Sequence, residues 1–154
     1  TMVKPNFFMQ NLLSSAKSIR EQGRFSLPMG GGTTGMADAR DIGAVCAEVL
    51  IGKGHAGKSY EITGPEVLTF NQVAERFSEV VGRKIEYVPM SMAQFRERMT
   101  GILKPWHLNA VCALFQEIAD IGLDHTTDTF KNLIGREPIS LRQFIEDHIA
   151  LFRA

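Results

Sequence analysis

The chain has 154 residues, 44% of them apolar and 22% charged, a composition typical of a globular domain with a sizeable core. Lysine plus arginine equals aspartate plus glutamate at 17 each, so the basic excess of a nucleic-acid-binding surface is missing. No apolar run is long enough to span a bilayer. Cys46 and Cys112 lie at apolar helical positions outside any C-x-x-C pattern, which favours reduced thiols in a cytoplasmic protein. We therefore expect one domain, residues 1–154, that binds neither nucleic acid nor membrane.

The first part of the chain alternates extended segments with helical periodicity. Residues 1–5 predict the end of a strand, and apolar side chains at helical spacing then predict a helix that Gly23 ends. Asn6 is expected to cap this helix, because its side chain can accept a free amide proton of the first turn. Residues 25–27 are a short extended segment, and residues 36–38 could form another.

A second helix is predicted to begin at Asp41 and to end at Gly52. Its apolar positions recur at helical spacing. The carboxylate of Asp41 is expected to act as an N-cap or as a first-turn anion, since a negative charge there offsets the free amides. Residues 59–63 then predict a strand that Gly64 closes.

The later helices are predicted by their first residues. Thr69, Ser91 and Ser140 each begin an [ST]-x-x-Q capping box flanked by an apolar pair. A strand over residues 84–89 separates the first two of these helices. Pro105 suits the first turn of a further helix, whose apolar arc is wide enough to indicate deep burial or an oligomer contact. The pattern predicts a helix-rich α/β domain with three or four short strands.

Two glycine-rich segments match nucleotide-binding patterns. Residues 52–59 fit G-x-x-x-x-G-K-[ST], but they follow a predicted helix and precede a strand, so no helix N-terminus faces a phosphate. We expect a flexible loop there. Gly30, Gly32 and Gly35 fit G-x-G-x-x-G, but the extended segment before them is short and polar and contains Pro28. A wide turn between two short strands is the favoured interpretation, and dinucleotide binding by this loop is the alternative.

Catalytic patterns are sparse. Neither Tyr60 nor Tyr87 is followed by lysine four positions on, and no G-x-S-x-G occurs. The four histidines have no metal-ligand spacing. We therefore predict no catalytic residue and no metal site from these patterns.

Three segments together resemble NmrA-like proteins, a branch of the atypical short-chain dehydrogenase/reductases. Residues 4–11, KPNFFMQN, resemble the family's R-P-x-x-F-M-E-N segment. Residues 38–43, DARDIG, resemble its D-V-R-D-I-A segment. Residues 60–69, YEITGPEVLT, followed by Gly82 and Arg83, resemble its Y-x-L-T-G-P-E-x-L-T … G-R pattern. The likeness covers nearly the whole chain.

The resemblance implies a Rossmann-type fold that binds NAD(P), in reductases of quinones or carbonyl-like substrates or in non-catalytic redox sensors. It also implies that this chain corresponds to the helix-rich C-terminal, substrate-side half of such a protein. The N-terminal dinucleotide-binding half, with its glycine fingerprint, would lie upstream. Weak or absent NAD(P) binding is therefore expected for this chain alone.

Position by position, the resemblance assigns a segment at the nicotinamide end of the cofactor: Pro5, Asn6, Phe7 and Phe8. It assigns a second set near the substrate: Phe8, Met9, Gly31 and Gly32. The aromatic residues indicate a small apolar or aromatic ligand, although core packing explains them equally well. Two alternatives to a portion of a reductase stay open: a stand-alone ligand-binding or homodimeric module, and a redox sensor without turnover.

Overall fold

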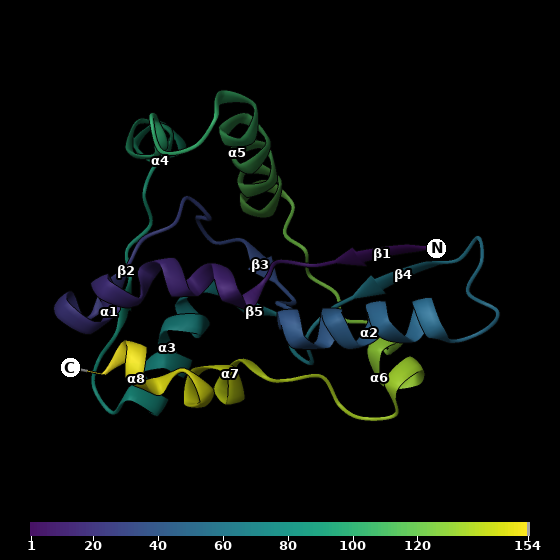
Figure 1. Cartoon of the computed structure of the whole chain (residues 1–154). Helices are drawn as coiled ribbons and strands as arrows, with labels where there is room; N and C mark the ends of the chain where they lie inside the picture. The colour runs from purple at the N-terminus through teal and green to yellow at the C-terminus, as the bar shows by residue number, and fades with distance from the viewer. Residues whose placement is uncertain (154) are drawn as a thin grey trace.

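The computed structural model describes residues 1–153, which form an α/β structure of short strands and many helices (Figure 1). The strands are β1 (Met2–Pro5), β2 (Arg24–Phe25), β3 (Thr33–Thr34), β4 (Ser59–Ile62), β5 (Leu68–Thr69) and β6 (Glu86–Tyr87). The helices are the 3-10 helix η1 (Met9–Ser15), α1 (Ala16–Gln22), α2 (Ala39–Ile51), α3 (Phe70–Val81), α4 (Met92–Met99), α5 (Pro105–Asp120), α6 (Thr129–Ile134), α7 (Leu141–Asp147) and α8 (Ile149–Phe152).

The strands pair two by two. β1 runs parallel to β4, with Val3 opposite Tyr60 and Lys4 opposite Glu61. β2 runs parallel to β6, and β3 runs antiparallel to β5. The prediction of three or four strands was therefore too low. β3 and β5 have two residues each and exist because distant segments pair, which no local periodicity reveals.

The apolar core has two parts. The larger part packs α1, α3, α5, α7 and α8 around buried aromatic rings such as Phe70 and Phe77. The smaller part consists of Ala37, Val45, Ile62 and Phe130, and it lies between the β1–β4 pair and the helices α2 and α6. Figure 1 shows α2 and α6 on the same side of these two strands.

Two of the three predicted capping boxes are complete. Thr69 and Ser91 each accept a hydrogen bond from the amide three residues on, and the glutamine side chain at that position bonds back to the amide of the cap. At Ser140 only the first bond forms. The Gln143 side chain donates to Asp147 instead, so the third capping box has only one of its two hydrogen bonds.

Two predicted features between β1 and α2 are wrong. Asn6 does not cap the following helix, because η1 begins only at Met9 and the Asn6 side chain bonds elsewhere. Residues 36–38 do not form a strand; Ala37 makes an isolated bridge with Phe8. The backbone there turns at once into α2, which leaves no room for a longer ladder.

The cap of α2 also differs from the prediction. Asp38, and not Asp41, is the N-cap, and its carboxylate accepts a hydrogen bond from the Arg40 amide at 2.8 Å. Asp41 does lie in the first turn, as the alternative prediction had it. Its buried carboxylate accepts hydrogen bonds from the Ile139 amide at 2.6 Å and from Arg136 at 2.7 Å. Asp41 therefore holds a distant loop against α2.

One edge of β1 has no partner strand within residues 1–153. The amides of Met2 and Asn6 donate to carbonyls on the β4 side. Because a parallel strand alternates the direction of its backbone groups, the polar groups of Val3 point to the opposite edge. Parallel sheets are normally continued and covered on both faces. The unpaired edge of β1 therefore leaves room for a further strand.

Candidate functional site

The carboxyl ends of the parallel strands β1 and β4 meet in a small polar cluster. The Asn6 Oδ1 accepts hydrogen bonds from the Phe7 amide at 2.6 Å and from the buried Thr34 hydroxyl at 2.8 Å. Thr63, which follows β4, accepts a hydrogen bond from the Thr127 amide at 2.9 Å. These bonds fix the direction in which the chain leaves the sheet. In open parallel sheets, ligands bind in the crevice outside the carboxyl ends of the strands.

Phe7 connects this end of the sheet with an apolar cleft. Its ring is buried, with its centroid 6.0 Å from that of Phe70 and 6.2 Å from that of Phe115 on α5. Phe7 is also among the residues that line the cleft. The next residue, Phe8, is 37% exposed. The predicted nicotinamide-end segment therefore leads directly from the strand ends into a cavity.

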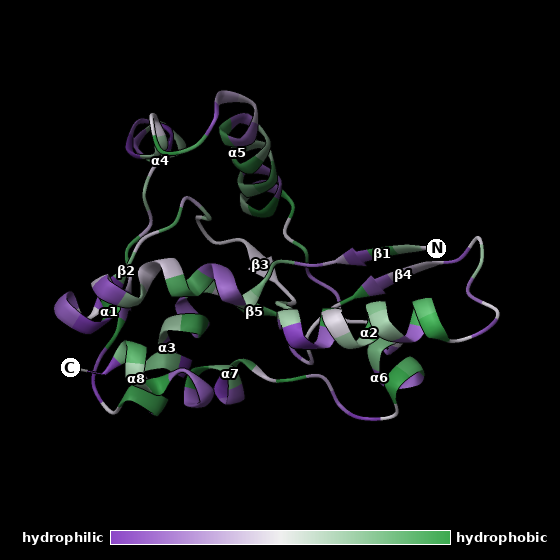
Figure 2. Ribbon diagram, in the orientation of Figure 1, coloured by the Kyte–Doolittle hydropathy of each residue, from purple (hydrophilic) through white to green (hydrophobic). Residues whose placement is uncertain are grey.

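The cleft has a volume of about 960 Å³ and lies between η1–α1 on one side and α4–α5 on the other. Its first wall is mainly polar, with Gln10, Asn11, Ser14 and Ser18 among its residues. Its second wall and floor are mainly apolar: Leu27, Val88, Met90, Phe95, Met99, Ile102, Leu103, Val111, Leu114 and Phe115. Figure 2 shows α5 as a largely hydrophobic helix that stands out from the body of the molecule. An apolar cavity with a few polar groups is the usual form of a small-molecule site.

Phe8 is not among the residues that line this cleft, and the other predicted substrate residues also lie outside it. Met9 is 1% exposed and packs in the larger core. Gly31 is exposed in the loop between β2 and β3, and Gly32 is buried beside α5. A Cβ atom at Gly32 would lie 2.1 Å from the carbonyl oxygen of Ile118. Only a residue without a side chain lets the loop approach α5 so closely, and the assignment of these three residues to substrate stays a prediction.

Neither glycine-rich segment has the form of a dinucleotide pyrophosphate site. Residues 52–59 connect the end of α2 to the start of β4. Gly30 and Gly32 lie in the loop between β2 and β3, whereas Gly35 follows β3, so a short strand interrupts the segment that was expected to be one wide turn. A Cβ atom at Gly35 would lie 2.9 Å from the His125 carbonyl oxygen, so that glycine serves packing and does not face an open cradle. Neither segment leads directly into the N-terminus of a helix, which is the feature that binds the phosphates of a dinucleotide.

Ion pairs anchor α2 beside the site. The Asp38 side chain is fully buried in the structure, and Arg40 bonds it at 2.9 Å and also bonds Asp147 at 2.6 Å. Burial by itself raises the pKa of Asp38, but the hydrogen bonds and charge of Arg40 outweigh it and leave that pKa below its ordinary value of 3.8. The same guanidinium, together with Gln143, lowers the pKa of Asp147. The ion pairs of Arg40 with Asp38 and Asp147 thus connect α2 with α7.

Two histidine pairs lie near the β1–β4 strands. His125 bonds Glu61 at 2.7 Å, and His55 bonds the Tyr60 hydroxyl at 2.7 Å. Over residues 1–153, no three histidine, cysteine, aspartate or glutamate side chains gather as a metal site. None of the helices in that range is long and apolar enough to cross a bilayer.

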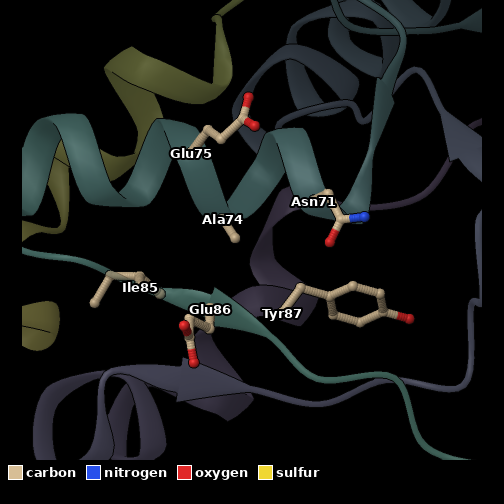
Figure 3. A pocket seen from close by; sticks show the side chains of 6 residues that line it. All are labelled: Asn71, Ala74, Glu75, Ile85, Glu86 and Tyr87. Atoms are coloured by element: carbon tan, nitrogen blue, oxygen red, sulfur yellow. The ribbon is translucent and has the colours of Figure 1, made fainter.

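A second hollow of about 480 Å³ lies between α3 and β6. Figure 3 shows Asn71 and Ala74 on α3 facing Ile85 and Tyr87 across it. The Tyr87 hydroxyl does not act as a free group there, because it donates to the Leu27 carbonyl at 2.8 Å. Polar side chains also line this hollow, namely Asn71, Glu75 and Glu86, but it has only half the volume of the cleft, which is therefore the better candidate site.

The α4–α5 wall is the part of the site that sequence patterns missed. The wide apolar arc of α5 indicated deep burial or an oligomer contact. The structure instead divides that arc between a buried face, which includes Leu108 and Cys112, and cleft-lining positions, which include Val111 and Leu114. The apolar arc of α5 is too wide to be buried by one packed face, and this width was the only feature of the sequence that could have indicated the cleft wall.

Comparison with known proteins agrees with this geometry. The model of the NmrA-like family matches residues 1–145. The NAD(P)H azoreductase of Xenophilus azovorans is 38% identical over 155 aligned positions, which cover 100% of this chain and 54% of the azoreductase. The chain spans about half the length of the curated relatives it matches.

Solved structures show the same relationship. The NADPH-dependent quinone oxidoreductase QOR2 of Escherichia coli, solved with NADPH, has a TM-score of 0.81 and 27% identity over 94% of this chain and 53% of its own. The triphenylmethane reductase of Citrobacter, solved with NADP(H), has a TM-score of 0.77 at 21% identity over 93% of this chain and 50% of its own, a likeness of fold. Relatives in this group thus bind NADPH. The chain belongs to the NmrA-like family and has an α/β, Rossmann-like fold that corresponds to about half of its full-length relatives.

Proposed function

We propose that this chain is the C-terminal, substrate-side portion of an NAD(P)H-dependent oxidoreductase of the quinone- or carbonyl-reducing type. The observation that carries the proposal is the position of Phe7. Phe7 follows the carboxyl end of β1, where parallel α/β folds bind ligands, and it is among the residues that line the apolar cleft beside α4 and α5. A substrate in that cleft would lie beside the predicted nicotinamide end.

The remaining cofactor contacts are assigned to another portion of the fold. The free edge of β1 supports a sheet that continues beyond this chain, and the relatives are about twice as long. When bound, the nicotinamide would supply the redox chemistry. The contribution of this chain is to hold and orient the substrate: Pro5 and Asn6 shape the strand end, and the apolar wall excludes water.

A second candidate function is a stand-alone ligand-binding or homodimeric module. Trp106, Ile102 and Ile121, at or beside the ends of α5, are each at least 70% exposed, which supports a contact between two copies.

Titration with NADPH separates the two candidates. The chain alone is compared with the chain joined to the part of the Xenophilus azovorans azoreductase that it does not match. The proposal expects saturable NADPH binding by the joined protein and none, or far weaker binding, by the chain alone. Tight binding by the chain alone would contradict a substrate-side portion. A folded joined protein that fails to bind NADPH would contradict the shared fold.

A further inference from the structure

We propose that the cleft selects a flat aromatic substrate that carries an anionic group, such as a carboxylate or a sulfonate. This inference rests on the proposed function, because it assigns the charge of the substrate bound in the same cleft. It starts from the ionised side chains in the cleft lining: Lys17 and Glu21 on α1, Arg24 on β2, and Arg98 on α4. Three are cations and one is an acid, in a chain whose formal net charge is zero.

Lys17 and Arg98 are the cations without a protein partner. Within residues 1–153 neither makes an ion pair or a side-chain hydrogen bond. Some cations elsewhere on the surface differ, because Arg40, Arg136 and Arg142 each bond a carboxylate within 3.0 Å, whereas Lys53 has no ion pair within residues 1–153 either. The cleft therefore keeps two cations available for a ligand.

The opposing charge in the cleft is weakened. The Glu21 carboxylate lies 3.8 Å from the Arg20 guanidinium, which offsets its charge. Arg24 lies opposite Glu86 in the β2–β6 register and donates to the Gln22 side chain. Its charge therefore adds less to the positive potential in the cleft than the charges of Lys17 and Arg98. The remaining field attracts an anion, and low-dielectric walls strengthen it.

The two unpaired cations lie on opposite walls. Lys17 belongs to the polar α1 wall and Arg98 to α4, whose neighbours Phe95 and Met99 form part of the apolar wall. A ligand with an apolar ring system and one acidic substituent can bury its rings against α4 and α5 while its acid pairs with either cation. A neutral ring system would leave both cations unused.

Binding to this chain can be followed with its single tryptophan. Trp106 lies next to His107, which lines the cleft, and the two rings stack with centroids 5.4 Å apart. Anthraquinone-2-sulfonate and the neutral 2-(hydroxymethyl)anthraquinone share the same ring system. We expect the sulfonate to quench Trp106 fluorescence with an affinity about tenfold higher, and added salt to weaken only the sulfonate, because salt screens exposed charges.

Matched variants locate the effect. Arg98→Gln and Lys17→Gln should each lower the affinity for the sulfonate about threefold, the range of an exposed ion pair, and leave the neutral compound unchanged. Lys53→Gln removes the same charge from the exposed loop after α2 and should change neither. Circular-dichroism melting curves check that each variant folds.

The outcomes distinguish this inference from the proposed function. Equal affinities for the two compounds, with saturable quenching by both, would overturn the anion preference and leave the substrate-side proposal intact. No binding of either compound, checked by calorimetry, would contradict both the anion preference and the use of this cleft as a substrate site. An equal loss of sulfonate affinity in Lys53→Gln would also overturn the anion preference, because it would show an effect of net charge alone.

Discussion

Asp41 should contribute more to stability than a helix cap would. Its carboxylate is 2% exposed and accepts hydrogen bonds from the Ile139 amide and from Arg136. In Asp41→Ala the half-buried Ile139 amide loses its acceptor, which costs about 1–3 kcal/mol. The Arg136 side chain is 48% exposed, so the ion pair adds only about 0.2–1 kcal/mol. We expect the free energy of unfolding to fall by about 2–3 kcal/mol.

Urea unfolding at neutral pH measures this loss. Two further variants separate the contribution of the Ile139 hydrogen bond from that of the ion pair with Arg136. Asp41→Asn keeps an acceptor for the Ile139 amide and should cost about 1 kcal/mol. Arg136→Gln removes only the exposed ion pair and should cost at most about 1 kcal/mol. For a chain of this size the alanine variant should melt about 5–10 °C lower. A loss below about 1 kcal/mol in Asp41→Ala, or an equal loss in Arg136→Gln, would refute the assignment of the half-buried amide bond as the main contribution.

Three further predictions concern packing, pH and capping. Gly32→Ala should cost about 1–3 kcal/mol in urea unfolding, because its methyl group would meet a backbone carbonyl at 2.1 Å, whereas Gly31→Ala, with open space around it, should be nearly neutral. The pKa of Asp38 lies below 3.8 in the folded state, so its stabilising contribution is present above that pH and is lost as the pH falls through the folded value. Unfolding measured from pH 6 to pH 2 should therefore show a shallower acid loss in Arg40→Gln than in the wild type, and an unchanged slope would count against the pair. Thr69→Ala should cost about 1 kcal/mol, because a complete capping box is lost; an unchanged melting temperature would contradict that role.

Local chemistry predicted the parts of the fold that depend on neighbouring residues. The boxes at Thr69 and Ser91 formed as expected, and Pro105 opens α5. Each of these signals involves side chains within one helical turn of the amide they satisfy. The strands over residues 1–5 and 59–63 were also predicted from short-range composition.

Features that depend on distant partners could not be predicted in this way. Asp41 bonds Arg136 and Ile139, which lie 95 and 98 positions further along the chain. Its burial could therefore not be predicted from the neighbouring residues. Asn6 bonds Thr34, 28 positions away, instead of capping the next helix. The cleft forms between α1 and the α4–α5 pair, which only the tertiary fold brings together. The family resemblance pointed to Phe7, but the wall opposite it required the structure.

Steady-state NADPH oxidation with a quinone, using the chain joined to the unmatched portion of the azoreductase, tests most directly whether this chain is the substrate-side portion of a reductase. We expect turnover by the joined protein and none by either portion alone. We also expect Phe7→Leu, which keeps most of the buried apolar volume at this core position, to raise KM or lower kcat while the joined protein still binds NADPH. Turnover by this chain alone, or an assembled joined protein that binds NADPH and reduces no quinone or carbonyl substrate, would contradict the account.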